Sequence, residues 1–338
     1  MSLGFGLLSA QVRPGESDWS RVYDETIRIA VDAERLGFSS IWTTEHHFVD
    51  DGYMPSLMVV SAAIAAVTER IEIGSGVLLA PLHHPLRLAE DAATVDLISH
   101  GRLLLGLGLG WSEVEFEAMG ASMSQRGAAM EEILQILPRA WSGEPFRHEG
   151  EVYEYPELAV RPTPSRKIPV LIGGSAEPAI RRAARLADGI FSNAPIAKFL
   201  NQVEWVREEL EKAGRDPADF RIIHYSVLFP ADSEEAAWAE GLPHMWPMMW
   251  KYSDMEASAS RSGPPPEAPP PTERAREILE SRATFASTPE QIVDQLNQVR
   301  ETAGVRVDFV ARSYFPTMTY EQQLELMERL ATAVAPHV

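Results

Sequence analysis

The fold class is decided by the stretch IEIGSGVLLAPLHHPLRLAEDAATVDLISHGRLLLGLG, residues 71–108. It passes from an apolar β-rich segment through an amphipathic segment into a second apolar segment. The same alternation recurs outward from it, and it predicts strands at 3–9, 39–44, 71–79, 102–108, 168–173, 221–229, 282–286 and 307–314. Helical patterns lie between them, for example at 20–36 and 289–303. This alternation is typical of a parallel α/β fold.

Eight strand–helix units predict a closed (β/α)8 TIM barrel that forms one domain, residues 1–338. A bare barrel needs about 250 residues, so roughly 90 residues are additional. They are concentrated in two insertions, 111–166 after the fourth predicted strand and 231–281 before the seventh. The second insertion contains HMWPMMWKY at 244–252 and GPPPEAPPP at 263–271. We interpret it as a mobile flap over the barrel mouth, with a helix packed on the barrel as the alternative for 244–252.

The composition excludes several classes of function. The chain has no cysteine, which excludes disulfides, zinc ribbons, iron–sulfur clusters and thiol nucleophiles. Its formal net charge of -19 repels nucleic acid and anionic membranes, so we expect neither as a partner. The N-terminal sequence MSLGFGLLSAQVRPGE has no basic region followed by a long apolar run, and we expect a cytoplasmic protein.

A polar cluster, TTEHHF at 43–48, ends the second predicted strand. Active sites of TIM barrels are built at the carboxyl ends of the strands, where this cluster lies. Glu45, His46 and His47 make a poor metal site, because neighbours on a strand point to opposite faces and no third ligand follows at a helical spacing, so we predict no metal. An imidazole held by a carboxylate can instead exchange a proton near neutral pH. An equally good interpretation is that these residues are buried polar groups that form hydrogen bonds with one another.

Glycines recur at the ends of the third and fourth predicted strands, in GSG at 74–76 and GLG at 106–108. A flat ring system lying against the strand ends would explain both, because a residue without Cβ allows close approach. The motif GxGxxG is incomplete, since Trp111 stands at its last glycine, so no nicotinamide site is predicted.

The fifth predicted strand runs into IGGSAEP at 172–178, a glycine turn followed by a helix. Gly174 and Ser175 could cradle a phosphate there, because a helix N-terminus presents free N–H groups. An ordinary strand-to-helix turn is the alternative. Arg126 or Arg102 could supply the positive charge that a phosphate site needs.

Several motifs together resemble the luciferase-like flavin monooxygenases, with the first two closest to the bacterial luciferase α subunit: EHHF at 45–48, HPLRLAED at 84–91, DLISHGR at 96–102, GLG at 106–108, IGGS at 172–175 and ADG at 187–189. The resemblance extends from residue 39 to about 190 and includes the helix at Pro289 and the last strand, but not the insertion 231–281. It implies a TIM barrel that binds reduced FMN. The flavin reacts with O2 to form a C4a-hydroperoxide, which oxygenates a small organic substrate such as an aldehyde or ketone.

The resemblance also implies roles for individual residues. By position, His46 corresponds to the catalytic histidine and Glu45 to the acidic residue beside the flavin. Gly76 and Val77 occupy the place of a cis peptide bond against the flavin ring. Three residues match phosphate-binding positions, Gly174, Ser175 and Arg126. At two further positions the sequence departs from luciferase: Leu109 replaces a phosphate-binding arginine, and Gly108, at the flavin site, replaces a reactive cysteine.

The expected partners are a small-molecule substrate, O2, a separate flavin reductase and a second copy of the chain. The homodimer would form through the helices after strands two and three, where SAAIAAV at 61–67 allows close helix approach. Three alternatives remain open: hydride transfer with an 8-hydroxy-5-deazaflavin on the same fold, a non-catalytic flavin-binding subunit, and a metal-free barrel hydrolase. Retention of His46 is an argument against the non-catalytic subunit. A hydrolase would need two carboxylates at strand ends, and only Glu45 is placed in this way.

Overall fold

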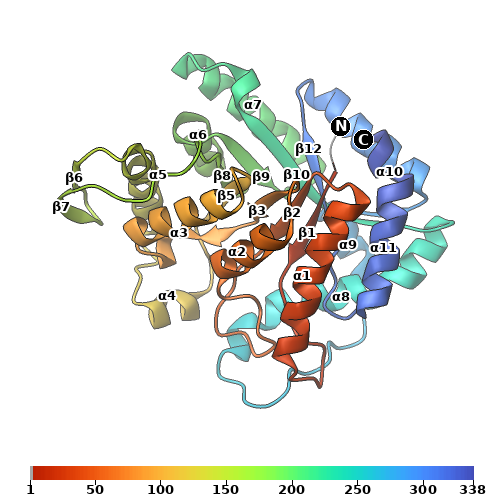
Figure 1. Ribbon diagram of the computed structural model, residues 1–338. Helices are drawn as coiled ribbons and strands as arrows, with labels where there is room; N and C mark the ends of the chain where they lie inside the picture. Colours follow the sequence, from red (N-terminus) through yellow and green to blue (C-terminus); the bar gives the residue numbers. More distant parts are fainter. Residues whose placement is uncertain (1–2) are drawn as a thin grey trace.

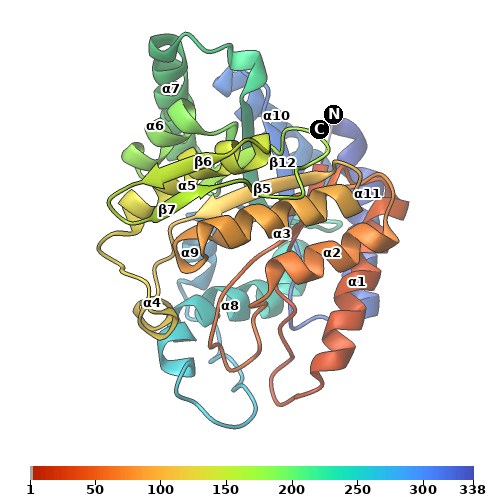
Figure 2. The same ribbon diagram turned by 60° about the vertical axis from the view of Figure 1, so that its left-hand side comes forward.

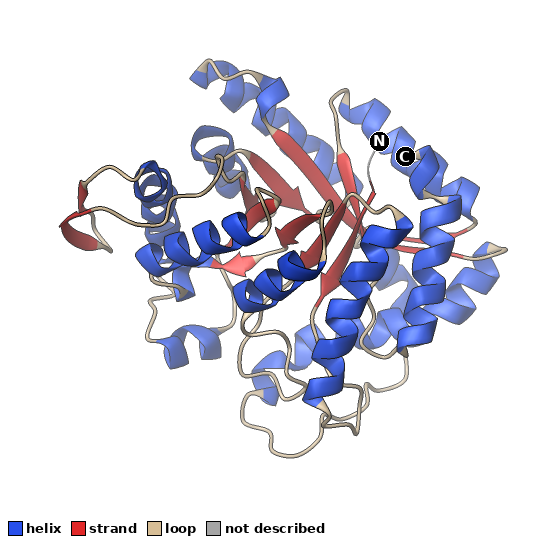
Figure 3. Ribbon diagram, in the orientation of Figure 1, coloured by secondary structure: helices blue, strands red, loops and turns tan. Residues whose placement is uncertain are grey.

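Eight parallel strands close into a barrel in the computed structural model, which describes residues 3–338 (Figure 1). Around the barrel they are β1 (Leu3–Leu8), β2 (Ser40–Thr43), β3 (Glu72–Ser75), β5 (Leu103–Gly108), β8 (Val170–Gly173), β9 (Gly189–Ser192), β10 (Arg221–Pro230) and β12 (Asp308–Arg312). The barrel closes because β10 pairs with both β9 and β12. Figure 3 shows the strands at the centre with helices outside them. The predicted TIM barrel is confirmed.

Two strand assignments differ from the prediction. One barrel strand, β9, was not among the predicted strands. The predicted strand 282–286 corresponds to β11 (Thr284–Ser287), which pairs with the last residues of the ten-residue β10, 227–230, outside the closed ring. The insertion 231–281 therefore lies between the seventh and eighth barrel strands, and not before the seventh.

The helices follow the predicted pattern closely. The predicted helices 20–36 and 289–303 correspond to α1 (Trp19–Leu36) and α10 (Pro289–Ala303). Thr288 caps α10 by accepting a hydrogen bond from the N–H of Gln291. The other helices of the outer layer are α2 (Leu57–Val67), α3 (Pro85–Ile98), α6 (Glu177–Leu186), α7 (Ile196–Ala213) and α11 (Tyr320–Ala333).

Both insertions have regular structure. The first contains α4 (Glu113–Met119), α5 (Arg126–Ser142) and an antiparallel hairpin, β6 (Phe146–Glu149) and β7 (Glu154–Leu158). The second contains α8 (Glu234–Ser258), a proline-rich loop and α9 (Ala275–Glu280). The segment 244–252 is therefore helical, although α8 includes two prolines. In Figures 1 and 2, α8 lies at the end of the barrel opposite the chain termini.

A cluster of charged residues joins α8 to the loop after β2. Lys251 forms ion pairs with Asp50, Asp51 and Asp254, and Arg261 adds contacts to Asp50 and Asp254. The side chains of Lys251 and Asp50 are almost completely buried. Mobility of the insertion 231–281 remains a prediction, and these ion pairs would have to break in any large displacement of α8.

The interior of the barrel is filled by apolar side chains: Leu7, Trp42, Leu104, Leu171, Phe191, Ile223 and Val310. Trp42 stacks on Phe191 with ring centroids 4.4 Å apart, and Phe191 stacks on Tyr225 at 4.5 Å. A second and larger apolar core lies between the strands and the outer helices. The packed interior forms a floor, so a ligand site must lie at the mouth.

Within residues 3–338, no helix combines the length and the apolarity that crossing a membrane requires. Residues 1–2, which belong to the predicted domain 1–338, lie outside the described residues.

Arg102 does not face the phosphate turn that the sequence suggested for it. It precedes β5, at the amino end of the strands, and its side chain is buried. The guanidinium donates hydrogen bonds to Thr68 Oγ1 at 2.9 Å and to the carbonyl oxygens of Ala65, Thr68, Ile71 and Ser99 at 2.7–2.9 Å. Most of these acceptors follow α2 or end it, so Arg102 satisfies the unpaired carbonyl groups of a helix C-terminus.

We predict that Arg102→Ala lowers the free energy of unfolding by about 2–4 kcal/mol, because several buried acceptors lose their donors. Urea denaturation would measure the loss. Arg70→Ala is the control, because the Arg70 side chain is 70% exposed, and we expect a change within about 0.5 kcal/mol. Equal effects of the two substitutions would contradict the assigned role.

Candidate active site

His46 and Glu115 form a buried pair at the barrel mouth. The Nδ1 atom of His46 lies 2.9 Å from Oε1 of Glu115, and the N–H of His47 donates to the same oxygen at 2.7 Å. The side chains of His46 and Glu115 are 7% and 2% exposed. An ionised carboxylate can only accept, so Nδ1 carries the proton and Nε2 is left to exchange one. This pairing orients the imidazole for acid–base chemistry.

Glu45, the acidic residue that the family resemblance places beside the flavin, is not the carboxylate that contacts His46. Its predicted role stays untested. Glu45 accepts a hydrogen bond from the N–H of Leu79 at 2.6 Å, and its Oε1 lies 3.0 Å from Nε2 of His83 and 3.4 Å from Nε2 of His47. Burial raises the pKa of the Glu45 carboxyl, but the contacts with His47, His83 and Leu79 outweigh this and lower the pKa to about 2. His46 and His47 thus contact different carboxylates.

His83 supplies the third group that the sequence analysis did not find. It follows the short 3-10 turn Ala80–Leu82, after β4 (Leu78–Leu79), and its contact with Glu45 raises the pKa of its imidazole despite burial. The ligand atoms of Glu45, His47 and His83 lie within 4.8 Å of one another, a set that could hold a metal ion. A third ligand is therefore present although the strand spacing predicted none, because His83 comes from the loop after β4. A hydrogen-bonded ionic cluster explains the same distances.

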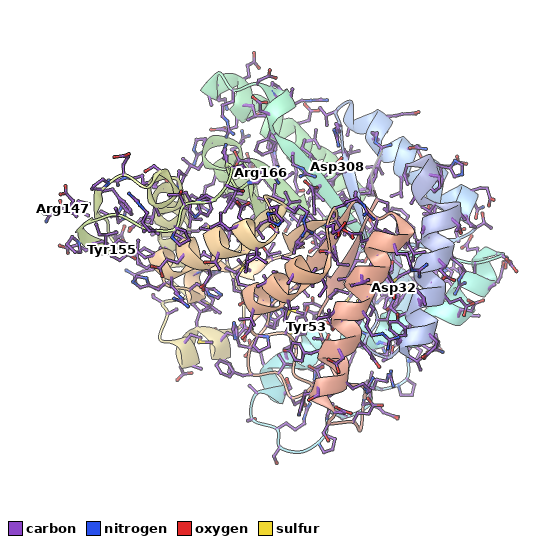
Figure 4. The ribbon with its side chains drawn as sticks, in the orientation of Figure 1. Asp32, Tyr53, Arg147, Tyr155, Arg166 and Asp308 are labelled. Carbon is purple, nitrogen blue, oxygen red and sulfur yellow. The ribbon has the colours of Figure 1, made fainter. Side chains whose placement is uncertain are left out.

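Three aromatic side chains surround His46. Ring centroids of Tyr53, Trp111 and Tyr252 lie 4.9, 5.6 and 5.8 Å from its imidazole, all edge-on. The hydroxyl groups of Tyr53 and Tyr252 are 3.1 Å apart. Figure 4 labels Tyr53 near the α8 end of the molecule, with Asp308, the first residue of β12, at the other end. Side chains from the loop after β2, the loop after β5 and α8 thus meet around one imidazole.

The glycines at the strand ends allow neighbouring residues of the same barrel to pack closely against them. The peptide bond between Gly76 and Val77 is cis, as the family resemblance implied. A Cβ atom at Gly108 would lie 2.4 Å from Val77 Cγ2, and one at Gly173 would lie 2.5 Å from Val77 Cγ1. A Cβ at Gly106 would lie 2.0 Å from the carbonyl oxygen of Ser75. Packing around Val77 therefore explains these glycines without a ligand ring.

A cavity of about 480 Å³ opens beside this cluster. Its walls come from the ends of β10 and β12, from α8 and from the loop after β9, and they are formed by Ser175, Asn193, Ala194, Pro195, Lys198, Tyr225, Val227, Met248, Met249, Tyr252, Ser281, Arg282, Thr284 and Arg312. Tyr252 belongs to this wall and also packs on His46, so one side chain connects the cavity with the imidazole, which does not itself line the cavity.

The far end of the cavity can bind an anion. Ser175 lies just before α6, and Lys198 Nζ lies 3.4 Å from Ser175 Oγ. No side chain caps α6 at Ala176. Pro178 has no N–H and the N–H of Ala179 donates to the carbonyl of Ala176 at 3.0 Å, so among the described residues only the N–H of Glu177 stays available in the first turn. The hydroxyl, the ammonium group and this N–H together could contact the phosphate of a flavin.

Arg126, the third predicted phosphate ligand, begins α5, donates to the carbonyl of Met123 at 2.9 Å and is not among the residues that line the cavity. Its role toward a phosphate stays a prediction.

The sequence predicted a site at the carboxyl end of the second strand. Several residues that complete this site were not predicted. Glu115 lies 69 positions from His46, and Tyr252 and Arg312 lie still farther along the chain. The acidic helix EVEFEAM at 113–119 and Tyr252, inside the predicted flap, were the available signals. No spacing rule connects them, because only the folded barrel brings them together.

Known proteins resemble this chain in sequence and fold. The F420-dependent glucose-6-phosphate dehydrogenase of Nakamurella multipartita is 32% identical over 225 residues, which are 63% of this chain and 66% of that protein. The oxygenase component of a flavin-dependent trigonelline monooxygenase of Acinetobacter baylyi is 34% identical over 146 residues, 43% of this chain and 40% of that protein. Each match spans less than two thirds of the relative's length.

A solved structure, the monooxygenase RslO1 of Streptomyces bottropensis, has the same fold, with a TM-score of 0.84 at 24% identity, covering 100% of this chain and 99% of that one. The profile of the luciferase-like monooxygenases matches residues 3–306. This match covers most of the chain and confirms the resemblance that the motifs indicated. The chain therefore belongs to the luciferase-like monooxygenase family.

Proposed function

We propose that this protein is the oxygenase component of a two-component flavin monooxygenase. It would use reduced FMN, delivered by a separate reductase, and O2 to oxygenate a small organic substrate that carries a carbonyl group. The observation that carries the proposal is the buried His46–Glu115 pair beside a cavity whose far end, at Ser175 and Lys198, can hold a phosphate. A reduced flavin bound there would supply the electrons that activate oxygen.

The chain's own residues have three tasks in this reaction. Glu115 fixes the tautomer of His46, which then gives or takes a proton through Nε2. Gly174 and Ser175 hold the phosphate. The cis peptide between Gly76 and Val77, whose side chain packs on Gly108, forms the wall against which we place the flavin ring. Met248 and Met249 of α8 line the cavity and keep water from the reacting groups.

Hydride transfer with the deazaflavin F420 is the second candidate. The F420-dependent relative is matched over 63% of this chain, more than the trigonelline monooxygenase component, which favours this alternative. Titration of the protein with reduced FMN and with reduced F420, followed by flavin fluorescence under anaerobic conditions, separates the two. Our proposal requires the tighter binding for FMN, and tighter binding of F420 would replace it. Binding of neither would contradict both.

We predict that His46→Ala lowers product formation about 100- to 10,000-fold, the usual range for loss of a general acid or base. Glu115→Gln should lower it about 10- to 100-fold, because the amide orients the imidazole less well and cannot stabilise its charge. The measurement is single-turnover product yield from a panel of aldehydes and ketones with pre-reduced FMN. Binding of reduced FMN should be unchanged in both variants.

The matched control for Glu115 is Glu117→Gln, an exposed carboxylate on the same helix. This variant should keep the parental yield. If Glu115→Gln and Glu117→Gln behave alike, Glu115 does not position His46. If His46→Ala keeps the parental yield, the proton must come from another group.

We further propose a homodimer through α2 and α3, as the sequence analysis expected. Val59 and Val67 of α2 are 71% and 50% exposed, and Leu97 and Ile98 at the end of α3 are 38% and 40% exposed. Exposed apolar side chains on two neighbouring helices are typical of an interface.

We predict a dimeric mass at micromolar concentration by light scattering and a monomeric mass for Val59→Asp, because a carboxylate at the interface would be desolvated without a partner. Val31→Asp on α1 is the control, since Val31 is 41% exposed but lies outside α2 and α3, and it should leave the mass unchanged. A monomeric parent protein would rule the dimer out.

A further inference from the structure

The cavity beside His46 is lined by cationic groups and by no acidic one. Lys198, Arg282 and Arg312 contribute to its wall, and among the described residues that line it there is no aspartate or glutamate. The chain as a whole carries 49 acidic residues against 30 basic ones. A cavity with this excess of positive charge in such an acidic protein favours an anionic ligand.

Arg312 is the most unusual of these cations. It is the last residue of β12, opposite Gly6 of β1, and it is half-buried in the wall of the cavity. Its Nη2 donates to the hydroxyl of Tyr252 at 2.8 Å, and within residues 3–338 it forms no ion pair. A guanidinium has five N–H donors, so most of its donors remain available to the cavity.

The surrounding tyrosines do not balance this charge. Burial raises the pKa of Tyr225 to about 12 and raises the pKa of Tyr53 well above its usual value. Both phenols are therefore neutral at physiological pH. The guanidinium also lies over the ring of Tyr252, 5.2 Å from its centroid, which gives only partial compensation for a half-buried charge.

We propose that Arg312 binds an anionic group of the substrate, most simply a carboxylate, and thereby directs the other end of the substrate toward His46. The inference rests on the proposed function. A carboxylate matches the planar, two-pronged donor set of arginine and would complete the pairing of a half-buried charge. Tyr252 contacts both Arg312 and His46, so a substrate held by Arg312 lies next to the proton carrier.

The cofactor's phosphate has a different place in the same cavity. Lys198 contacts Ser175, which lies just before α6, whereas Arg312 contacts Tyr252, which packs on His46. Two separate cationic positions in one cavity correspond to two anions. Because an anionic cofactor group could also reach Arg312, binding of substrate-like and cofactor-like anions has to be measured separately.

The test compares acids with their neutral amides in the cofactor-free protein. The probes are acetate and acetamide, benzoate and benzamide, and phenylacetate and phenylacetamide, with dissociation constants from ligand-observed NMR titration. We expect at least one acid to bind about tenfold or more tightly than its amide. Arg312→Gln should abolish that preference and leave amide binding unchanged, because only the charged contact is removed.

Lys198→Gln is the matched control. It should weaken binding of FMN and of inorganic phosphate while keeping the preference for the acid, and Arg312→Gln should do the reverse. If Arg312→Gln does not fold, as judged by circular dichroism and thermal melting, Tyr252→Phe replaces it. This variant frees the guanidinium from its hydroxyl partner and should change the binding of the acid more than that of the amide.

The proposal is overturned if no acid is preferred over its amide, or if Arg312→Gln weakens FMN or phosphate binding as much as carboxylate binding. In the second case the anion bound by Arg312 belongs to the cofactor, and the proposed function stands. Conversely, failure of the parent protein to bind any reduced flavin would contradict the proposed function, while the comparison of acid and amide would still report on Arg312.

Discussion

The site depends on the closure of a parallel barrel through β10, which pairs with β9 on one side and β12 on the other. Because all eight strands run in the same direction, their carboxyl ends meet around one mouth. Stacked rings such as Trp42 and Phe191 fill the interior beneath it. Polar side chains at the strand ends therefore lie together at the barrel mouth, and the candidate active site is confined to this place.

Two buried carboxylates divide the polar cluster at this mouth. Glu115 holds His46 on the side of the cavity, and Glu45 joins His47 and His83 on the other side. Each negative charge is compensated by imidazole or backbone N–H groups, as burial requires. Among the described residues, Arg312 has no negatively charged partner. We therefore infer that a ligand in the cavity supplies the negative charge that pairs with it.

The two insertions supply several of the side chains that form the candidate site at the barrel mouth. The first supplies Glu115 through α4, and the second supplies Met248, Met249 and Tyr252 through α8. These segments cover the mouth, where side chains can change without disturbing the packed interior. The charge cluster around Lys251 joins α8 to the loop after β2, so the wall of the cavity and the loop that carries His46 are linked.

The amino-acid sequence by itself determined the barrel, the two insertions, most strands and the place of His46, because periodicity and strand-end position are local properties. It did not indicate β9, and it did not indicate Glu115 as the carboxylate that contacts His46. Only the tertiary structure brought Glu115, His83 and Arg312 to the mouth. These contacts join residues 38 to more than 200 positions apart, and such contacts arise from barrel closure, which local sequence patterns do not encode.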